Sequence, residues 1–232
     1  MDPILEGLIK AFWLLVSFDP EVYGIMFLTL RVSGIAVILG AILGVPTGAT
    51  VALREFAGKR FFISMVNTMM GLPPVVVGLF VYLLLSSSGP LGPLQLLYTP
   101  TAMIIAQLTI AAPIVVGVTL SAVGSVDKAI RDKALSLGAT RFQLTLTILK
   151  ESRLGLVTAV ILAFGAAVSE VGAVMIVGGN IRWATRVLTT AIVFETELGE
   201  FSVAIALGII LLLLAFIINW LLTQMQWSGL RR

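Results

Sequence analysis

The sequence has no cysteine and no histidine, and only 12% of its 232 residues are charged. These absences exclude disulfides, thiolate nucleophiles, histidine acid–base catalysis, and metal or haem sites built on either residue. Soluble domains carry about 25% charged residues, so a water-soluble globule of this composition could not cover its surface with polar groups. Hydrophobic residues make up 59% of the chain instead. We therefore expect lipid to be the solvent for most of it.

Apolar stretches of the length that a membrane requires occur five times in the sequence. A hydrocarbon core roughly 30 Å thick needs about 20 apolar residues in a helix. The stretches do not alternate as the strands of a membrane barrel do, so we predict an all-α integral membrane protein with one transmembrane domain over residues 21–232. The five predicted spans are Tyr23–Leu53, Phe61–Leu85, Pro100–Gly124, Leu154–Gly178 and Phe201–Met225.

The lysines and arginines are divided unevenly between the two sides of these spans. Eleven of the fifteen, among them Arg231 and Arg232, fall on one side, three fall on the other, and Arg31 lies within the first span. Because basic loops remain in the cytoplasm, we predict a multi-pass protein of the cytoplasmic membrane with its N-terminus outside and its C-terminus inside. The net charge of +3 then belongs to the inner membrane face, and no nucleic-acid partner is expected.

Residues 1–20 precede the first predicted span and have a different pattern. Ile4, Leu8 and Phe12 recur at helical spacing, with Glu6 and Lys10 off that face. This pattern predicts an amphipathic helix at the outer membrane interface. A sixth, short span is the alternative.

The longest polar interruption is the segment 125–153, between the third and fourth spans. Asp127 and Asp132 suit helix starts, Gly138 can end a helix, and Thr140–Leu149 is expected to restart one. Small residues at such a bend allow another protein to approach closely, which favours a docking projection. An ordinary amphipathic loop, solvated on one side, is the alternative that composition leaves open.

This segment resembles the loop shared by permease subunits of ATP-binding-cassette importers, written EAA, three residues, glycine, nine residues and I-x-L-P. Asp132-Lys133-Ala134 stands in for EAA, Gly138 follows six residues after Asp132, and Ile148 follows ten after Gly138. Lys150 and Glu151 replace the closing leucine and proline. The resemblance implies that an ATPase subunit docks on nine residues: Asp132, Lys133, Ala134, Leu135, Gly138, Ala139, Thr140, Arg141 and Phe142.

Two more stretches resemble molybdate and tungstate permeases, and the tungstate permeases most closely. They are the run from Gly71 through Pro73 and Pro74, and the run from Ser169 and Glu170 to Asn180. The resemblance implies a type I importer permease that forms a homodimer, with two ATPase subunits inside and an extracytoplasmic oxyanion-binding protein outside. The implied cargo is tungstate, with molybdate or another oxyanion such as sulfate as the alternative. A secondary transporter and a membrane-embedded enzyme are further alternatives.

ATP hydrolysis is not expected in this chain, since the phosphate-binding pattern Gly-x-x-x-x-Gly-Lys-Ser/Thr does not occur in it. Moving one charge against a membrane potential costs about 2.3 kcal/mol per 100 mV, so import of a dianion must be driven. ATP and Mg²⁺ are therefore expected on a separate ATPase subunit. We predict no catalytic residue, no cofactor and no metal site here.

Charged and polar residues in the spans are the candidates for a gate. Arg31 and Glu170 lie at matching depths and are predicted to form an ion pair, or Glu170 repels anions as part of an outer gate. Pro73 and Pro74 predict either a static kink or a hinge in the second span. The other pathway candidates are polar residues near these positions or at the outer mouth: Asn67, Thr68, Ser169, Asn180, Arg182 and Thr185. Arg182, with Arg186, is expected either to receive the anion or to pair with Glu195, Glu197 or the binding protein.

Overall fold

The computed structural model describes residues 3–228, and those residues form helices and loops without a strand. Arg231 and Arg232 lie outside the described residues. The predicted all-α class is thereby confirmed. The helices in chain order are α1 (Pro3–Val16), α2 (Pro20–Leu53), α3 (Lys59–Met70), α4 (Pro74–Leu85), the 3₁₀ turn η1 (Gly92–Leu94), α5 (Pro100–Gly124), α6 (Lys128–Ser136), α7 (Arg141–Glu151), α8 (Arg153–Val168), α9 (Gly172–Gly178), α10 (Leu188–Glu197) and α11 (Phe201–Ser228).

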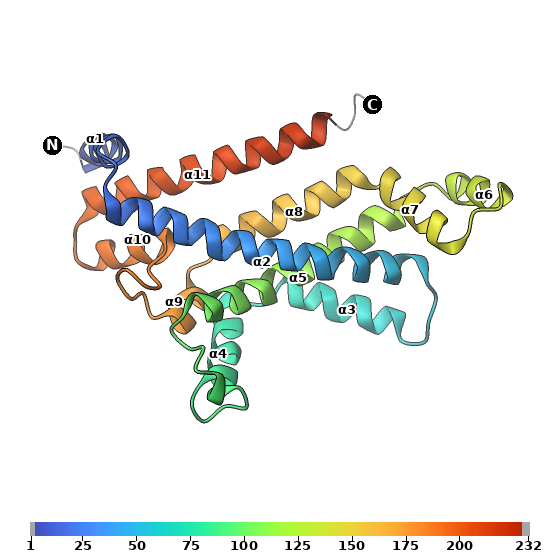
Figure 1. Cartoon of the computed structure of the whole chain (residues 1–232), viewed down its shortest axis with the longest axis horizontal. Helices are drawn as coiled ribbons and strands as arrows, with labels where there is room; N and C mark the ends of the chain where they lie inside the picture. The colour runs from blue at the N-terminus through green and yellow to red at the C-terminus, as the bar shows by residue number, and fades with distance from the viewer. Residues whose placement is uncertain (1–2, 229–232) are drawn as a thin grey trace.

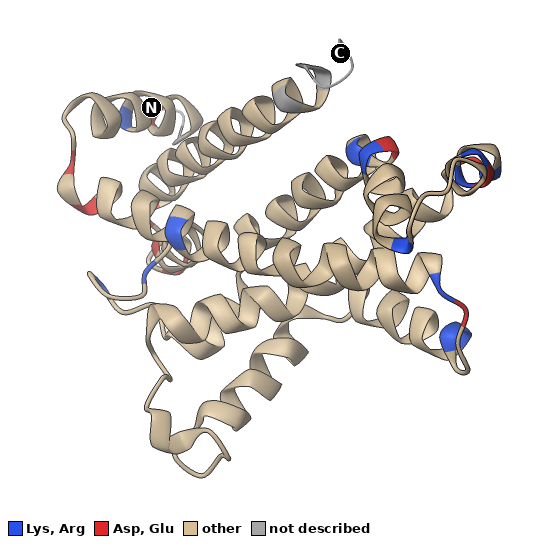
Figure 2. Ribbon diagram, turned by 45° about the vertical axis from the view of Figure 1, so that its right-hand side comes forward, with Lys and Arg blue, Asp and Glu red and all other residues tan. Residues whose placement is uncertain are grey.

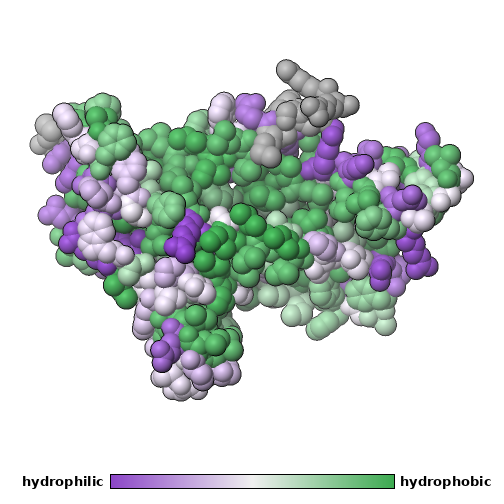
Figure 3. All heavy atoms as spheres, viewed as in Figure 1, coloured by the Kyte–Doolittle hydropathy of each residue, from purple (hydrophilic) through white to green (hydrophobic). Residues whose placement is uncertain are grey.

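Three of these helices, α2, α5 and α11, are each long and apolar enough to cross a bilayer. The pairs α3 with α4 and α7 with α8 pass the same test only when each bent pair is counted together. At 1.5 Å per residue the 34 residues of α2 extend about 51 Å, so α2 is longer than the hydrocarbon core is thick. Charged residues gather at the two ends of the molecule (Figure 2), and hydrophobic residues cover the middle of the face shown in Figure 3.

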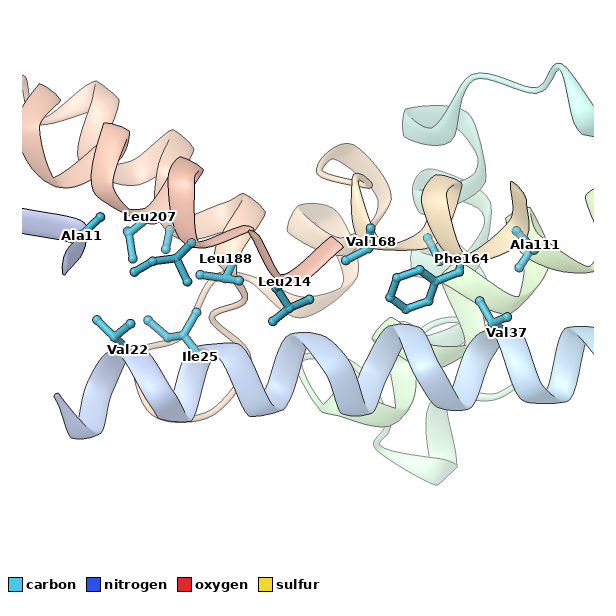
Figure 4. Packing of buried hydrophobic residues seen from close by; sticks show 14 of the residues in the cluster. Ala11, Val22, Ile25, Val37, Ala111, Phe164, Val168, Leu188, Leu207 and Leu214 are labelled. Carbon is cyan, nitrogen blue, oxygen red and sulfur yellow. The ribbon is translucent and has the colours of Figure 1, made fainter. Parts of the chain in front are cut away.

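The core lies along α2. Buried residues of α2 pack with residues of α5, α8, α10 and α11 in one hydrophobic cluster. Figure 4 shows Val22 and Ile25 of α2 directed toward Leu188 and Leu207, with Phe164 further along the helix. Leu188 is fully buried in this cluster. Helices that are distant in sequence are therefore held against one long central helix.

Helix α1 is a separate element that packs on α11. In Figure 1 it is seen end-on, whereas α2 and α11 extend across the view, so α1 lies crosswise to both. Its 14 residues cover about 21 Å, which is too short to cross the hydrocarbon core. Ile4, Phe12 and Trp13 are exposed, as an amphipathic helix that contacts lipid requires. Its place at the outer interface stays a prediction.

Two of the predicted spans are interrupted. The second span breaks between α3 and α4, where the chain bends by 100°. The fourth span, predicted to be continuous over Leu154–Gly178, breaks between Val168 and Gly172. Helix α4 points away from the body of the molecule in Figure 1 and packs against α9 along one face.

Candidate coupling loop and translocation elements

The segment 125–153 folds as the sequence predicted, into two short helices joined at a glycine. Asp127 caps α6, its Oδ1 accepting the backbone N–H of Ala129 at 2.9 Å. Gly138 follows α6 with a φ of +79°, a conformation that favours glycine. Thr140 then opens α7 through a capping box with Gln143, with N–O distances of 3.3 and 2.8 Å. Asp132 lies inside α6, so its prediction as a helix start is wrong.

This projection, the coupling loop, exposes apolar side chains on an otherwise polar surface. Leu137 is 79% exposed and Phe142 is 71% exposed, and Leu135 is also exposed. Among the other predicted docking residues, Ala134 and Ala139 are half-buried and the rest are exposed. Helix α6 packs chiefly on α7, and the pair protrudes at one end of the molecule (Figure 1). The loop therefore presents a small apolar surface that no part of the described chain covers.

At the opposite end, the connection 179–187 between α9 and α10, which we call the outer loop, is tied to the start of α2. Arg182 donates two hydrogen bonds to Glu21, Nε to Oε1 at 2.8 Å and Nη2 to Oε2 at 2.6 Å. Hydrogen bonding to Glu21, followed by the charge attraction of Glu21, raises the pKa of Arg182 above its usual value. Arg182 is thus paired with an acid, as one of the two sequence alternatives proposed. The acid is Glu21, which the sequence did not indicate.

Arg186 and Thr185 of the outer loop have different roles. Arg186 lies 3.8 Å from Glu21, between Nη1 and Oε1, and its guanidinium carbon is 4.5 Å from the ring centre of Phe194. Thr185 is fully buried; its hydroxyl donates to the carbonyl of Gly178 at 2.6 Å and accepts the N–H of Ile181 at 2.9 Å. Thr185 therefore holds the loop's shape instead of lining its surface.

Asn180, another predicted outer-mouth residue, lies in the same loop. It has a φ of +49°, a conformation that asparagine tolerates better than most residues. Its side-chain oxygen is buried and has no hydrogen-bond partner among the described residues. Asn180 therefore shapes the turn that follows α9.

The break between α8 and α9 is stabilised by side chains from other helices. Glu170 is buried, and its Oε1 accepts the N–H of Ala173 at 2.8 Å. Its backbone carbonyl accepts the hydroxyl of Thr189 in α10 at 2.9 Å. Gln107 in α5 donates from Nε2 to the carbonyl of Ala167 at 2.8 Å. Broken helices at membrane depth need such external partners for their backbone groups.

The sequence did not single out Gln107, although a signal was present. Gln107 is the only amide side chain in the predicted third span, and it is buried in the structure. Glu21 carries no comparable signal, because its partner Arg182 is 161 residues away in sequence.

The predicted ion pair between Arg31 and Glu170 is not formed. The ion pairs formed within residues 3–228 join Glu55 to Lys59, and Glu21 to Arg182 and Arg186. Arg31 is exposed on α2, whereas Glu170 is buried and caps the start of α9. Equal depth along two helices places residues at one level of the membrane, but it does not turn them toward each other.

The prolines of the second span start a helix instead of kinking one. Pro73 occupies the position before α4 and Pro74 its first position, where a missing N–H costs nothing.

Asn67 and Thr68 are exposed on α3, and the hydroxyl of Thr68 donates to the carbonyl of Ser64 at 2.9 Å. Ser169 is exposed at the other break, donating to the carbonyl of Gly165 at 2.8 Å. Asn67, Thr68 and Ser169 therefore lie on the surface of the chain and not in its interior.

Residues 36–226 match the family described as the binding-protein-dependent transport system inner membrane component. The chain belongs to this family. The permease is 44% identical over 226 residues to the tungstate uptake system permease TupB of Peptoclostridium acidaminophilum, covering 97% of this chain and 99% of that one. It is 39% identical to TupB of Campylobacter jejuni, covering 97% and 95%. A probable anion ABC transporter permease of Haloferax volcanii is 49% identical over 196 residues, covering 82% and 84%.

Solved structures share the permease's fold. The MetNI methionine ABC transporter, in inward-facing conformations, matches with a TM-score of 0.72 and 18% identity, covering 94% of this chain and 96% of that one. A bacterial alginate ABC transporter, in complex with an alginate-bound periplasmic protein, matches with a TM-score of 0.76 and 20% identity, covering 94% and 85%. The predicted fold, a type I ABC importer permease, is confirmed.

Proposed function

We propose that this permease forms the membrane pathway of an ATP-driven oxyanion importer and that its cargo is tungstate. The observation that carries the proposal is 44% identity to a tungstate uptake permease over nearly the whole of both chains. Apolar helices, with buried polar side chains that stabilise the break between α8 and α9, provide the membrane-embedded body.

The coupling loop is the proposed docking site for a separate ATPase subunit, which binds ATP and Mg²⁺. Its support is the exposed apolar surface of Leu135, Leu137 and Phe142 on a rigid, capped pair of helices. Apolar side chains surrounded by polar ones are the usual energetic centre of a protein interface. This assignment places the coupling loop in the cytoplasm and the outer loop outside, as the distribution of basic residues predicted.

A second copy of the chain is the proposed partner within the membrane, so that a complete transporter has two permeases and two ATPases. The support is α4, whose outward face exposes Val75, Leu79 and Phe80. A pathway between two copies would also bring Asn67, Thr68 and Ser169, which one copy leaves exposed, into its lining. Cyclic pairs of this kind are the commonest protein assemblies.

The outer end is the proposed contact for an extracytoplasmic oxyanion-binding protein. The structural neighbour that transports alginate is in complex with a periplasmic protein. In this arrangement the binding protein selects the anion, and Arg182, already paired with Glu21, positions the outer loop instead of capturing cargo.

A broader oxyanion range is the second candidate function. The 49% identical relative is described only as an anion permease, so its name does not restrict the cargo to tungstate. Molybdate and sulfate, the alternatives from the sequence, are the oxyanions to compare. The test is uptake into vesicles that contain the permease, its ATPase and its binding protein, with tungstate, molybdate and sulfate supplied separately. ATP-dependent accumulation of tungstate alone supports the proposal; uptake without an ATPase would refute ATP coupling.

A further inference from the structure

A cavity of about 450 Å³ lies between the ends of α1, α2, α10 and α11 that are remote from the coupling loop (Figure 1). Much of its wall is apolar, including Leu14, Ile25 and Leu207. Three basic and three acidic side chains also line it. They are Lys10, Arg182 and Arg186, and Asp19, Glu21 and Glu195.

Two of the three acids of this cavity are committed to other groups. Both carboxylate oxygens of Glu21 bind Arg182, whereas Glu195 forms no ion pair within residues 3–228. Asp19 caps α2, with its Oδ1 accepting the N–H groups of Glu21 and Val22 at 3.0 Å each. Among the described residues, Lys10 and Arg186 therefore have no hydrogen-bonded carboxylate, and Glu195 has no paired base.

Arg186 is the base with the least adequate partner. Its side chain is only 11% exposed, its one ion-pair contact is 3.8 Å long, and its Nε is buried without a hydrogen-bond partner. Lys10 forms no ion pair within residues 3–228. The ring of Phe194, 4.5 Å from the guanidinium carbon, does not supply the acceptor that Nε lacks. A buried donor without an acceptor is costly, and the planar fork of a guanidinium suits phosphate oxygens.

Phosphate-like oxygens could come from a lipid headgroup or from a free oxyanion, and the residues around the cavity distinguish the two. Helices α1 and α11 form part of the cavity wall, and α1 also exposes Phe12 and Trp13, as a helix in contact with lipid does. Equal numbers of acids and bases do not attract a free dianion, whereas they match a headgroup that carries both a phosphate and an amine. The apolar wall is suited to an acyl chain and not to an inorganic ion.

We propose that this cavity binds a zwitterionic phospholipid, with its phosphodiester at Arg186 and Lys10 and its amine near Glu195. The acyl chain covers the apolar wall and fills the space between α1 and the helix bundle. The lipid is thus a structural ligand that fastens α1 to the rest of the permease.

The test uses the purified full-length permease after extensive washing in detergent. Its thermal unfolding is followed while a short-chain phosphatidylethanolamine, a short-chain phosphatidylglycerol, sodium tungstate or inorganic phosphate is added. We expect phosphatidylethanolamine to raise the midpoint in a saturable manner. We expect Arg186→Gln to weaken this binding at least tenfold and Lys10→Gln to weaken it less. Lys150→Gln, at the other end of the molecule, is the matched control and should leave it unchanged.

Arg186→Lys keeps the positive charge and provides a second variant if Arg186→Gln fails to fold; it too should bind the lipid less tightly. Saturable stabilisation by tungstate or phosphate that Arg186→Gln abolishes would overturn the lipid assignment in favour of a free oxyanion. Stabilisation by phosphatidylethanolamine that survives in the Arg186 and Lys10 variants alike would overturn the site.

Discussion

Arg182 and Glu21 are joined by two parallel hydrogen bonds of 2.8 and 2.6 Å, although 161 residues separate them in sequence. This contact fixes the outer loop to the first turn of α2. The outer loop follows α9, which packs on the crosswise helix α4. The Arg182–Glu21 pair therefore connects the central helix α2 to α9 and, through α9, to α4. Helix α9 follows the break after α8, and α4 follows the break after α3.

We predict that Glu21→Gln loosens the outer loop. The expected loss of thermal stability is small, because the Arg182 side chain is largely exposed and exposed pairs contribute little. Because pairing with Glu21 raises the pKa of Arg182, the stability that Arg182 contributes is present at neutral pH. It is lost only when the pH becomes strongly alkaline and rises through the raised pKa. Hydrogen exchange of residues 179–187 should increase. Adding Arg182→Gln to Glu21→Gln should raise the exchange little further, because the pair is already broken; a fully additive increase would contradict the pairing.

We predict that Gly78→Ala separates α4 from α9. A Cβ at Gly78 would lie 2.6 Å from the Cα of Ala173, a backbone atom that cannot rotate away. Overpacking of this kind costs about 1–3 kcal/mol, to be measured by denaturant unfolding in detergent. Gly165→Ala in α8 is the control, since nothing lies within 4 Å of its added Cβ. Equal stability of the two variants would show that α4 does not pack so closely on α9.

We predict that Gln107→Leu weakens the α8–α9 break. The carbonyl of Ala167 would lose its side-chain donor and keep the backbone N–H groups of Ser169 and Glu170, the latter at 3.3 Å. One buried hydrogen bond contributes about 0.5–1.5 kcal/mol, so the unfolding free energy should fall by that amount. The control is Thr109→Val, because the hydroxyl of Thr109 bonds only within its own helix, to Ile105. If the Gln107 variant is as stable as this control, the hydrogen bond from Gln107 to Ala167 does not stabilise the break.

We predict that Phe142→Ala impairs docking of the ATPase subunit without unfolding the permease. The side chain is 71% exposed, so its removal leaves no internal cavity. We expect at least tenfold weaker ATPase binding in a titration with the purified subunit, about 1.4 kcal/mol, and a matching loss of ATP-dependent uptake. Phe61→Ala is a suitable control, since Phe61 is 76% exposed on α3. Unchanged affinity in the Phe142 variant would argue against the coupling loop as the docking site.

The features that the sequence predicted well are those with local causes. The ends of α6 and α7 follow from Asp127, Gly138 and Thr140, each of which acts on backbone groups within a few residues. Pro73 and Pro74 marked the place where the second span is irregular, because proline removes a backbone N–H. We predicted a kink or hinge there, whereas the structure has a break with a new helix starting at Pro74. The 100° angle at that break was not predicted, because it depends on how α4 packs on α9.

The features that the sequence did not predict depend on which faces of distant helices meet. Glu170 and Arg31 were predicted to pair from their matching positions along two spans, but the buried Glu170 instead accepts the N–H of Ala173. The break after Val168 is similar, because its stability comes from Gln107 on one helix and Thr189 on another. A hydropathy pattern gives the length of an apolar stretch. It does not show where side chains from distant helices bond to backbone carbonyls, so it predicted a continuous span where the structure has a break.

The crosswise course of α4 has a consequence for how the transporter is made. Helix α4 leaves the body with Val75, Leu79 and Phe80 uncovered. Under the proposed pairing with a second copy, a newly inserted protomer is an unfinished folding unit until another arrives. Pairing is second order, and its rate falls with the square of protomer density in the membrane. Cells that make little of this chain should therefore lose a disproportionate share of it to quality-control proteases before it matures.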